Sequence, residues 1–244
     1  MLVTLKTAIK NAPIIGRPLV RLGHAIARYR RYRTAAHNQV LAAENRQPFR
    51  SAEYWEIRYR VGRNSGAGSY NRLAAFKTHF LNEFVRSQDI GSVIEFGCGD
   101  GNQLTLACYP SYVGVDVSDT ALALCRDEFA SDPTKRFIGP EMAAGQRAEL
   151  ALSLDVIYHL VEDSVFDGYM RDLFGAADRY VIVYASNKDE PPVRHVRHRQ
   201  FTRWVAACEP DWLLQQIVPN AYPFDPADPD NTSFADFYVF GRAR

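Results

Sequence analysis

Residues 92–104 read Ser-Val-Ile-Glu-Phe-Gly-Cys-Gly-Asp-Gly-Asn-Gln-Leu (SVIEFGCGDGNQL), and this stretch decides the fold. Its first part, Ser92–Phe96, is short and mostly apolar, which predicts a buried strand. Three closely spaced glycines predict a loop, and Gln103–Ala107 predicts a helix after it. A strand, a glycine loop and a helix in this order indicate an open α/β sheet, which binds ligands at the carboxyl ends of its strands.

The rest of the chain continues this alternation. The predicted strands are Ser92–Phe96, Tyr112–Asp116, Lys135–Ile138, Leu150–Ile157, Tyr180–Tyr184, Trp212–Val218 and Phe234–Phe240. The predicted helices are Leu73–Val85, Gln103–Ala107, Ser118–Phe129, Val165–Ala177 and Phe201–Ala207, with Ser118 as an N-cap. Strands alternating with helices predict a Rossmann-like, doubly wound α/β fold with a mostly parallel seven-stranded sheet. No helix separates the last two strands, so we expect an antiparallel C-terminal hairpin strand.

Composition narrows the class of protein. The chain has 244 residues, of which 47% are hydrophobic and 23% charged, as in a globular protein that buries a sizeable core. Four scattered cysteines, with no Cys-x-x-Cys pair, fit neither a disulfide scaffold nor a zinc site. We therefore expect a cytoplasmic protein without a bound metal.

The charge is divided unevenly along the chain. Residues 1–50 carry ten Lys/Arg and one acid, a net +9, and the remainder carries 19 basic and 27 acidic residues, a net −8. This predicts a basic N-terminal extension, residues 1–48, before a domain at residues 49–244. No apolar run approaches the ~20 residues of a membrane span. The basic amphipathic pattern fits a solvated leader or peripheral membrane contact through residues 1–33, and the acidic body argues against nucleic acid as a partner.

The residue sequence of the glycine loop restricts the kinds of ligand that it can bind. Its glycines are Gly97, Gly99 and Gly101, and residue 102 is Asn, so the dinucleotide fingerprint Gly-x-Gly-x-x-Gly fails. No Gly-Lys-Ser/Thr follows, which excludes a P-loop. Carboxylates at Glu95 and Asp100 would repel a pyrophosphate, by several kcal/mol at low effective dielectric. A ligand with a cationic end, such as S-adenosylmethionine, would instead be attracted.

The second predicted strand supports a nucleoside ligand. It ends in Asp116, 15 residues after Gly101, where a carboxylate can accept both hydroxyls of a ribose. NAD and S-adenosylmethionine share that ribose, so Asp116 indicates a nucleoside without identifying it.

Three segments carry a resemblance to a known family: Ser92–Leu104, Tyr112–Asp119 and Leu152–Asp163. They resemble successive motifs of the class I S-adenosylmethionine-dependent methyltransferases, over about residues 50–244. Residues 54–59 resemble the leader helix that often closes over the cofactor in such enzymes. The resemblance implies S-adenosyl-L-methionine as cofactor and a methyltransferase activity.

The resemblance also assigns cofactor-binding residues. It implies that Glu95, Gly97, Gly99 and Gly101 line the methionine part, that Asp116 holds the ribose, that Val117 packs on the adenine, and that Asp155 lies near the methionine end. One departure concerns the residue after the third strand, which in the family often contacts the adenine amine. Here that strand runs into Gly139-Pro140-Glu141, and no such contact can be assigned.

Two histidines are the catalytic candidates. His159 follows the fourth strand, where the acceptor is expected, and an imidazole can serve as a general base near neutral pH. In several enzymes of this family a similar histidine packs against its neighbours or positions other groups, and is not the base. His195 belongs to Arg194–Arg199, whose two histidines and three arginines can grip an anionic acceptor. The same histidines have a spacing that a metal can use, but no pair of acids lies next to them.

Missing motifs narrow the acceptor. The fourth strand has no Asn/Asp-Pro-Pro-Tyr/Phe motif, which by family comparison argues against the exocyclic nitrogens of nucleic-acid bases as acceptors. No Pro-Cys follows the strand, which argues against cytosine C5 as the acceptor. A small molecule or a sugar/glycan remains, with O-methylation favoured. The alternatives are an N- or S-methyltransferase for detoxification and a non-catalytic module that only binds S-adenosylmethionine.

Overall fold

The computed structural model describes residues 32–243. The chain divides into two units, Met1–Ala43 and Glu44–Arg244, and the described part of the first unit is helical. The segment predicted to touch a membrane, residues 1–33, falls outside the described residues except for its last two. Among the described residues, no helix has the length and apolar character needed to cross a bilayer.

The second unit is built on a seven-stranded sheet with strand order β3-β2-β1-β4-β5-β7-β6. The strands are β1 (Val93–Phe96), β2 (Tyr112–Val115), β3 (Lys135–Ile138), β4 (Ala148–Leu154), β5 (Ala177–Ala185), β6 (Trp212–Val218) and β7 (Asp236–Arg242). Strands β1 to β5 pair in parallel, whereas β7 pairs antiparallel with both β5 and β6. The predicted mostly parallel sheet with one antiparallel C-terminal strand is confirmed.

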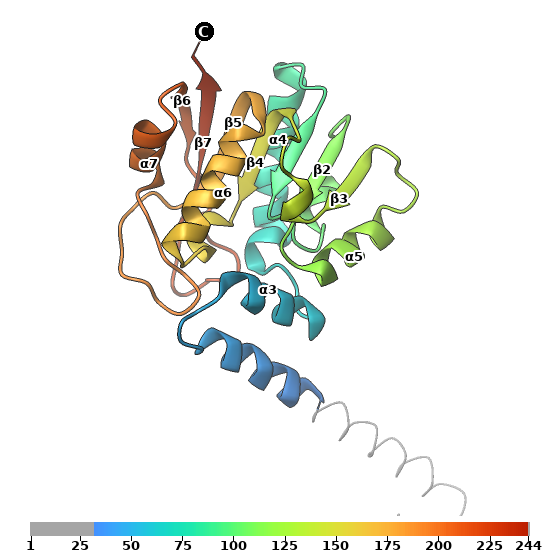
Figure 1. Cartoon of the computed structure of the whole chain (residues 1–244), viewed down its shortest axis with the longest axis vertical. Helices are drawn as coiled ribbons and strands as arrows, with labels where there is room; N and C mark the ends of the chain where they lie inside the picture. The colour runs from blue at the N-terminus through green and yellow to red at the C-terminus, as the bar shows by residue number, and fades with distance from the viewer. Residues whose placement is uncertain (1–31, 244) are drawn as a thin grey trace, which may run out of the picture. The chain divides into compact units, whose positions relative to one another are not determined.

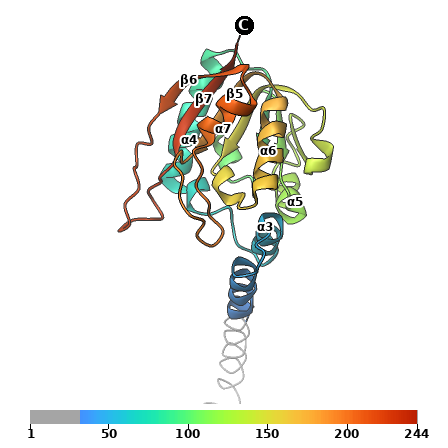
Figure 2. The same ribbon diagram turned by 60° about the vertical axis from the view of Figure 1, so that its left-hand side comes forward.

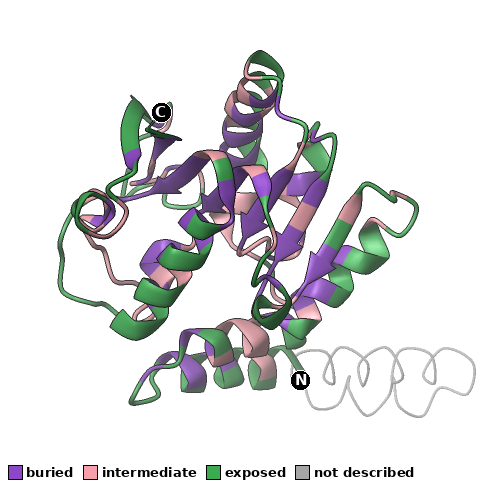
Figure 3. Cartoon of the chain, turned by 45° about the horizontal axis from the view of Figure 1, so that its top comes forward, coloured by how far each residue is buried: buried purple, intermediate pink, exposed green. Residues whose placement is uncertain are grey.

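Helices cover both faces of this sheet (Figures 1 and 2). They are α4 (Asn71–Ser87), α5 (Asp119–Glu128), α6 (Asp163–Gly175) and α7 (Phe201–Cys208), whereas α3 (Ser51–Arg60) lies beyond the carboxyl ends of the parallel strands. Buried residues of α4 and α5 pack on one face, and those of α6 and α7 pack on the other. Because both faces are covered, the central strands β1 and β4 are mostly buried, as Figure 3 shows.

Two predicted elements differ from the structure. Gln103–Ala107 is not an α-helix but a single 3-10 turn, η2 (Gln103–Leu106), in which the Thr105 N–H is shared between the carbonyls of Gly101 and Asn102. The fourth strand ends at Leu154 because Asp155 has a φ of +61°, which an extended strand cannot hold. A second 3-10 turn, η4 (Ile157–His159), follows it.

The capping prediction for α5 is confirmed. Ser118 precedes its first residue, and the Ser118 hydroxyl accepts a hydrogen bond from the Ala121 N–H at 3.1 Å. This fixes the start of α5 directly after Asp116, and so places that carboxylate at the carboxyl end of β2.

Candidate functional site

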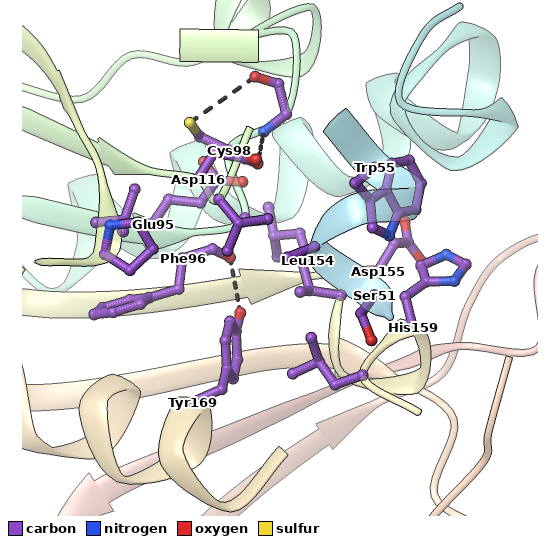
Figure 4. Close-up of a pocket in the computed structure, with 18 of the residues that line it drawn as sticks. Ser51, Trp55, Glu95, Phe96, Cys98, Asp116, Leu154, Asp155, His159 and Tyr169 are labelled. Atoms are coloured by element: carbon purple, nitrogen blue, oxygen red, sulfur yellow. Dashed lines mark hydrogen bonds between the residues drawn. The ribbon is translucent and has the colours of Figure 1, made fainter. Parts of the chain in front are cut away.

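A cavity of about 310 Å³ lies at the carboxyl ends of β1, β2 and β4. The glycine loop, the loop after β4, and residues of α3 and α6 form its walls. Figure 4 shows Asp116 and Cys98 toward one end, and Trp55 beside His159 toward the other. The cavity therefore joins the predicted donor site to the predicted acceptor site.

The glycine loop needs its glycines for two different reasons. Gly97, Gly99 and Gly101 all have φ between +59° and +79°, a region that favours glycine. At Gly97 an added Cβ would overlap the side chain of Val156, so the loop could not keep its place beside the cavity. Gly97 and Gly99 line the cavity, as predicted, whereas Gly101 does not: it packs against Cys125 of α5.

Asp116 is fixed by backbone donors. Its Oδ2 accepts from the Gly99 N–H and its Oδ1 from the Ser118 N–H, both at 2.9 Å. Burial raises the pKa of this carboxyl to about 6, although the backbone N–H groups oppose the shift. Asp116 lines the cavity, and the neighbouring Val117, half exposed, lines it as well. Both residues thus lie in the wall of one cavity, and their predicted ribose and adenine contacts stay predictions.

Glu95 supplies a second acid at the same end. It lies in β1, is buried, lines the cavity and accepts a 2.7 Å hydrogen bond from the Tyr112 hydroxyl. Burial raises its pKa to about 7. An ionised Glu95 or Asp116 is therefore costly unless a positive group comes near. This environment favours a cationic ligand.

Asp100 lines the cavity and also takes part in a structural hydrogen-bond network. Its Oδ2 accepts from the Ser65 N–H at 2.9 Å and from the Tyr70 hydroxyl at 2.8 Å, and its own N–H donates to Ser65 Oγ at 3.1 Å. Burial, with the added hydrogen bond, raises the pKa of Tyr70 to about 12. These bonds hold the segment between α3 and α4 against the glycine loop, so Asp100 acts as a structural anchor.

Asp155 lines the cavity but is already paired. Its Oδ2 lies 2.5 Å from Lys77 Nζ, and its Oδ1 accepts from the Tyr158 hydroxyl at 2.7 Å. With an internal ammonium and a phenol on its two oxygens, Asp155 is not a free carboxylate for a ligand. Lys77 was not predicted, although a lysine four residues after buried Leu73 and four before buried Leu81 is a signal of a buried charge.

The histidine ring of His159 faces the cavity at the end away from Asp116 (Figure 4). Its Nδ1 lies 3.0 Å from the carbonyl oxygen of His195, and because a carbonyl only accepts, Nδ1 carries the proton. Trp55 of α3 meets the ring edge-on, with centroids 5.0 Å apart. Burial lowers the pKa of His159 to about 3, so the ring stays neutral and its Nε2 keeps a lone pair.

The predicted anion-gripping segment, Arg194–Arg199, makes mostly internal contacts, and its Arg197, His198 and Arg199 line a second pocket apart from the cavity. His195 does not line the cavity, and its Nδ1 lies 2.6 Å from Glu44 Oε1. Arg197 and Arg199 both pair with Asp163, at 2.9 and 3.0 Å, and donate to carbonyls of the preceding loop. These arginines hold the chain after β4. Among residues 32–243, no three His, Cys, Asp or Glu side chains gather into a possible metal site.

Two walls of the cavity were only partly foreseen. α3 contributes Trp55 and Tyr59, both within the segment 54–59 that resembles the leader helix of the family. α6 contributes Tyr169, whose hydroxyl donates to the Phe96 carbonyl at 2.8 Å and bonds Ser153 Oγ at 2.7 Å. An aromatic residue on a helix gives no sequence signal that separates such a contact from ordinary packing.

Comparison with known proteins gives the fold a precedent. No family model matches the sequence, and no curated protein does. Among solved structures, magnesium protoporphyrin IX methyltransferase from Synechocystis PCC 6803, crystallised with bound S-adenosylmethionine, is 13% identical with a TM-score of 0.60, covering 82% of this chain and 100% of that one. The CurJ carbon methyltransferase is 10% identical with a TM-score of 0.55, covering 92% and 71%.

A third solved structure is that of an enzyme with a different class of acceptor. The small RNA methyltransferase HEN1 is 14% identical with a TM-score of 0.52, and the match covers 72% of this chain and 26% of that one. The chain therefore has the fold of the class I S-adenosylmethionine-dependent methyltransferases, a fold used on small molecules and on RNA alike.

Proposed function

We propose that this protein is an S-adenosyl-L-methionine-dependent methyltransferase that methylates a hydroxyl group on a small molecule or a sugar/glycan. The observation that carries the proposal is one continuous cavity, with Glu95 and Asp116 at the donor end and the neutral imidazole of His159 at the other. Solved structures of the same fold with bound S-adenosylmethionine or its demethylated product support the cofactor.

The residues present fit that cofactor. Glu95 and Asp116, whose ionised forms are held under strain by burial, would face its cationic end and its ribose. Gly97 and Gly99 allow the backbone to approach closely, and exposed Val117 offers an apolar surface for the adenine. When bound, the cofactor supplies an electrophilic methyl group on a sulfonium.

His159 is the proposed general base. A hydroxyl group becomes strongly acidic as its oxygen gives electron density to the incoming methyl group, so even an imidazole whose pKa burial lowers to about 3 can take the proton at Nε2 as the new C–O bond forms. The carbonyl of His195 occupies Nδ1–H and leaves Nε2 as the basic atom. Trp55, packed edge-on against the ring, keeps it from turning away.

Charge favours a small acceptor over RNA. Residues 51–244 carry 19 basic and 27 acidic side chains, whereas RNA binding draws on clustered positive charge. Because HEN1 shares the fold, RNA is the second candidate and belongs in the test. The same test, through its His159→Ala variant, also separates hydroxyl acceptors from thiol and amine acceptors, which need little base catalysis.

We propose a cytoplasmic location for this reaction. Cys98, Cys108, Cys125 and Cys208 are all free thiols, as expected in a reducing compartment. We further propose that the basic extension, residues 1–48, precedes the catalytic domain at 49–244, and that residues 1–33 make peripheral contact with anionic lipid.

The test uses methyl-labelled S-adenosylmethionine with the full chain. Small-molecule, polysaccharide and RNA fractions of the source cells are offered separately, and label in each is counted. We expect label in a small-molecule or polysaccharide product, and loss of at least about a hundredfold in turnover for His159→Ala with unchanged cofactor affinity. Transfer to RNA would replace the small-molecule or glycan acceptor, near-normal turnover of His159→Ala would replace the O-methylation proposal, and no cofactor binding by calorimetry would remove the enzyme proposal.

A further inference from the structure

The proposed base is held by residues outside the cavity. The ring of His159 stacks on that of His195, with centroids 5.3 Å apart and planes 17° from parallel. The backbone carbonyl of His195 accepts the Nδ1–H of His159. His195 therefore touches His159 twice, once through its ring and once through its main chain.

The carbonyl is presented by a tight turn. The Val193 and Val196 backbones exchange hydrogen bonds of 2.8 and 3.0 Å, with Arg194 between them at a φ of +53°. The turn also joins η4 directly, because the N–H of Arg197 donates to the Tyr158 carbonyl at 2.7 Å. The position of the His195 carbonyl thus depends on how firmly this turn is fixed.

Glu44 fixes the turn from a distant part of the sequence. Its carboxylate is 8% exposed, and Oε1 lies 2.6 Å from His195 Nδ1. Tyr54, itself buried, stacks on the His195 ring with centroids 4.7 Å apart. One oxygen and one aromatic face therefore set the orientation of His195.

The charged groups around the rings of His159 and His195 affect the protonation of both rings. The nearest charged groups are Glu44 and Asp155, which favour the protonated rings, and Arg58 and Arg194, which disfavour them. Burial outweighs these and lowers the pKa of His195 from its usual value of 6.5, so at pH 7 and above its ring is neutral and donates Nδ1–H to the Glu44 carboxylate. Both rings are then neutral with Nδ1 protonated.

We propose that Glu44 and His195 are positioning residues that hold His159 with its proton on Nδ1 and its lone pair on Nε2, directed to the acceptor. The proposal rests on the proposed function for the role of Nε2, but the arrangement itself can be observed without an acceptor. Neither residue lines the cavity, and the direct contact from this pair to a proposed reacting group is the one to His159.

The experiment is a two-bond ¹H–¹⁵N correlation spectrum of the ¹⁵N-labelled full chain between pH 5 and 8. In the wild type we expect His159 to remain neutral with a protonated Nδ1 throughout. Glu44→Ala should raise the Nε2–H tautomer of His159 about fivefold, the shift that loss of one ordinary hydrogen bond produces. Glu44→Gln keeps an oxygen that can accept from His195 and should restore the wild-type spectrum. Glu53→Ala, which removes an exposed carboxylate on α3, is the matched control.

The outcomes are decisive in either direction. A wild-type His159 that is charged at pH 6 or protonated on Nε2 overturns the proposal, even if no variant folds. A Glu44→Ala spectrum identical to that of the wild type also overturns the proposal. His195→Ala should match Glu44→Ala, and the double variant should be no worse than either, because the two act as one unit. Calorimetry with S-adenosylhomocysteine, run in parallel, tests the proposed function separately.

Discussion

Lys77 Nζ lies 2.5 Å from Asp155 Oδ2, although the two residues are 78 positions apart in the sequence. The lysine side chain is 0% exposed and the aspartate side chain 12%. The ring of Tyr184 lies below the ammonium at 5.2 Å. A buried cation therefore balances the one cavity carboxylate that has a strained backbone, with φ of +61°.

Replacing that lysine should destabilise the domain. Lys77→Met leaves the partly buried carboxylate of Asp155 without its counter-charge, which should cost up to about 3–5 kcal/mol, the range for fully buried pairs. Urea unfolding should show the loss, and adding Asp155→Asn should recover part of it. Arg86→Met, which breaks an exposed pair with Glu83, should leave the midpoint close to the wild type. A wild-type midpoint for Lys77→Met would contradict the account.

Gly97 and Gly145 form a matched pair for testing the glycine loop. Their φ angles are +79° and +77°, so alanine brings similar backbone strain at both, about 1 kcal/mol. Only at Gly97 does the new Cβ overlap a neighbour, Val156, whereas Gly145 has open space. Gly97→Ala should weaken S-adenosylhomocysteine binding at least about tenfold, and Val156→Ala should partly restore it. Equal binding by the two alanine variants would show that the close approach is unimportant.

Asp116→Ala should weaken binding of the same ligand. The lost carboxylate removes one or two hydrogen bonds from a charged group, each worth roughly 1.5–3 kcal/mol, so calorimetry should show at least about a tenfold higher Kd. Asp119→Ala, on the exposed first turn of α5, should leave the Kd unchanged. Unchanged affinity in Asp116→Ala would remove this residue from the site.

The affinity for S-adenosylmethionine should depend on pH. The pKa of Glu95 is raised to about 7 and that of Asp116 to about 6, so both carboxyls take up protons as the pH falls from 8 to 5.5. A cationic ligand favours their ionised forms, so binding releases protons and weakens as the pH falls. Calorimetry in buffers of different ionisation enthalpy measures that release directly. A pH-independent Kd would contradict the assignment of these acids to the donor site.

Acid should destabilise the domain partly through His159. Its pKa is lowered from 6.5 to about 3, so its contribution to stability is complete above pH 6.5 and is lost as the pH falls toward 3. At pH 5 the loss is about 2 kcal/mol. His159→Asn should therefore flatten the decline in unfolding free energy between pH 7 and 5, as urea titrations would show. An unchanged slope would mean that the ring is solvated.

The fold was predictable because its signals are local. Each buried strand is a short apolar run, and the glycine loop and Ser118 mark where strands stop and helices start. Where prediction was wrong, the cause was a single backbone angle or a short connection, as at Asp155 and at Gln103–Leu106. Neither leaves a periodic pattern in the sequence.

The site was predictable only where its residues follow a strand. Asp116, Glu95 and His159 were found because the carboxyl end of a strand is a defined place. The partners of the site residues could not be predicted. Glu44, which contacts His195, is 151 positions away from it in the sequence, and Lys77, which contacts Asp155, is 78 positions away. Such pairs depend on which helix packs over which strand end, and no spacing rule encodes that.

The place of β7 in the sheet has a consequence for how the protein is made. β7 is the last strand in sequence, yet it lies between β5 and β6. A nascent polypeptide emerging from the ribosome therefore exposes an unpaired margin of β5, and leaves β6 without any neighbour, until residues 236–242 have been translated. Open strand margins recruit other chains, so premature termination before residue 236 would yield an aggregation-prone product rather than a shortened but working one.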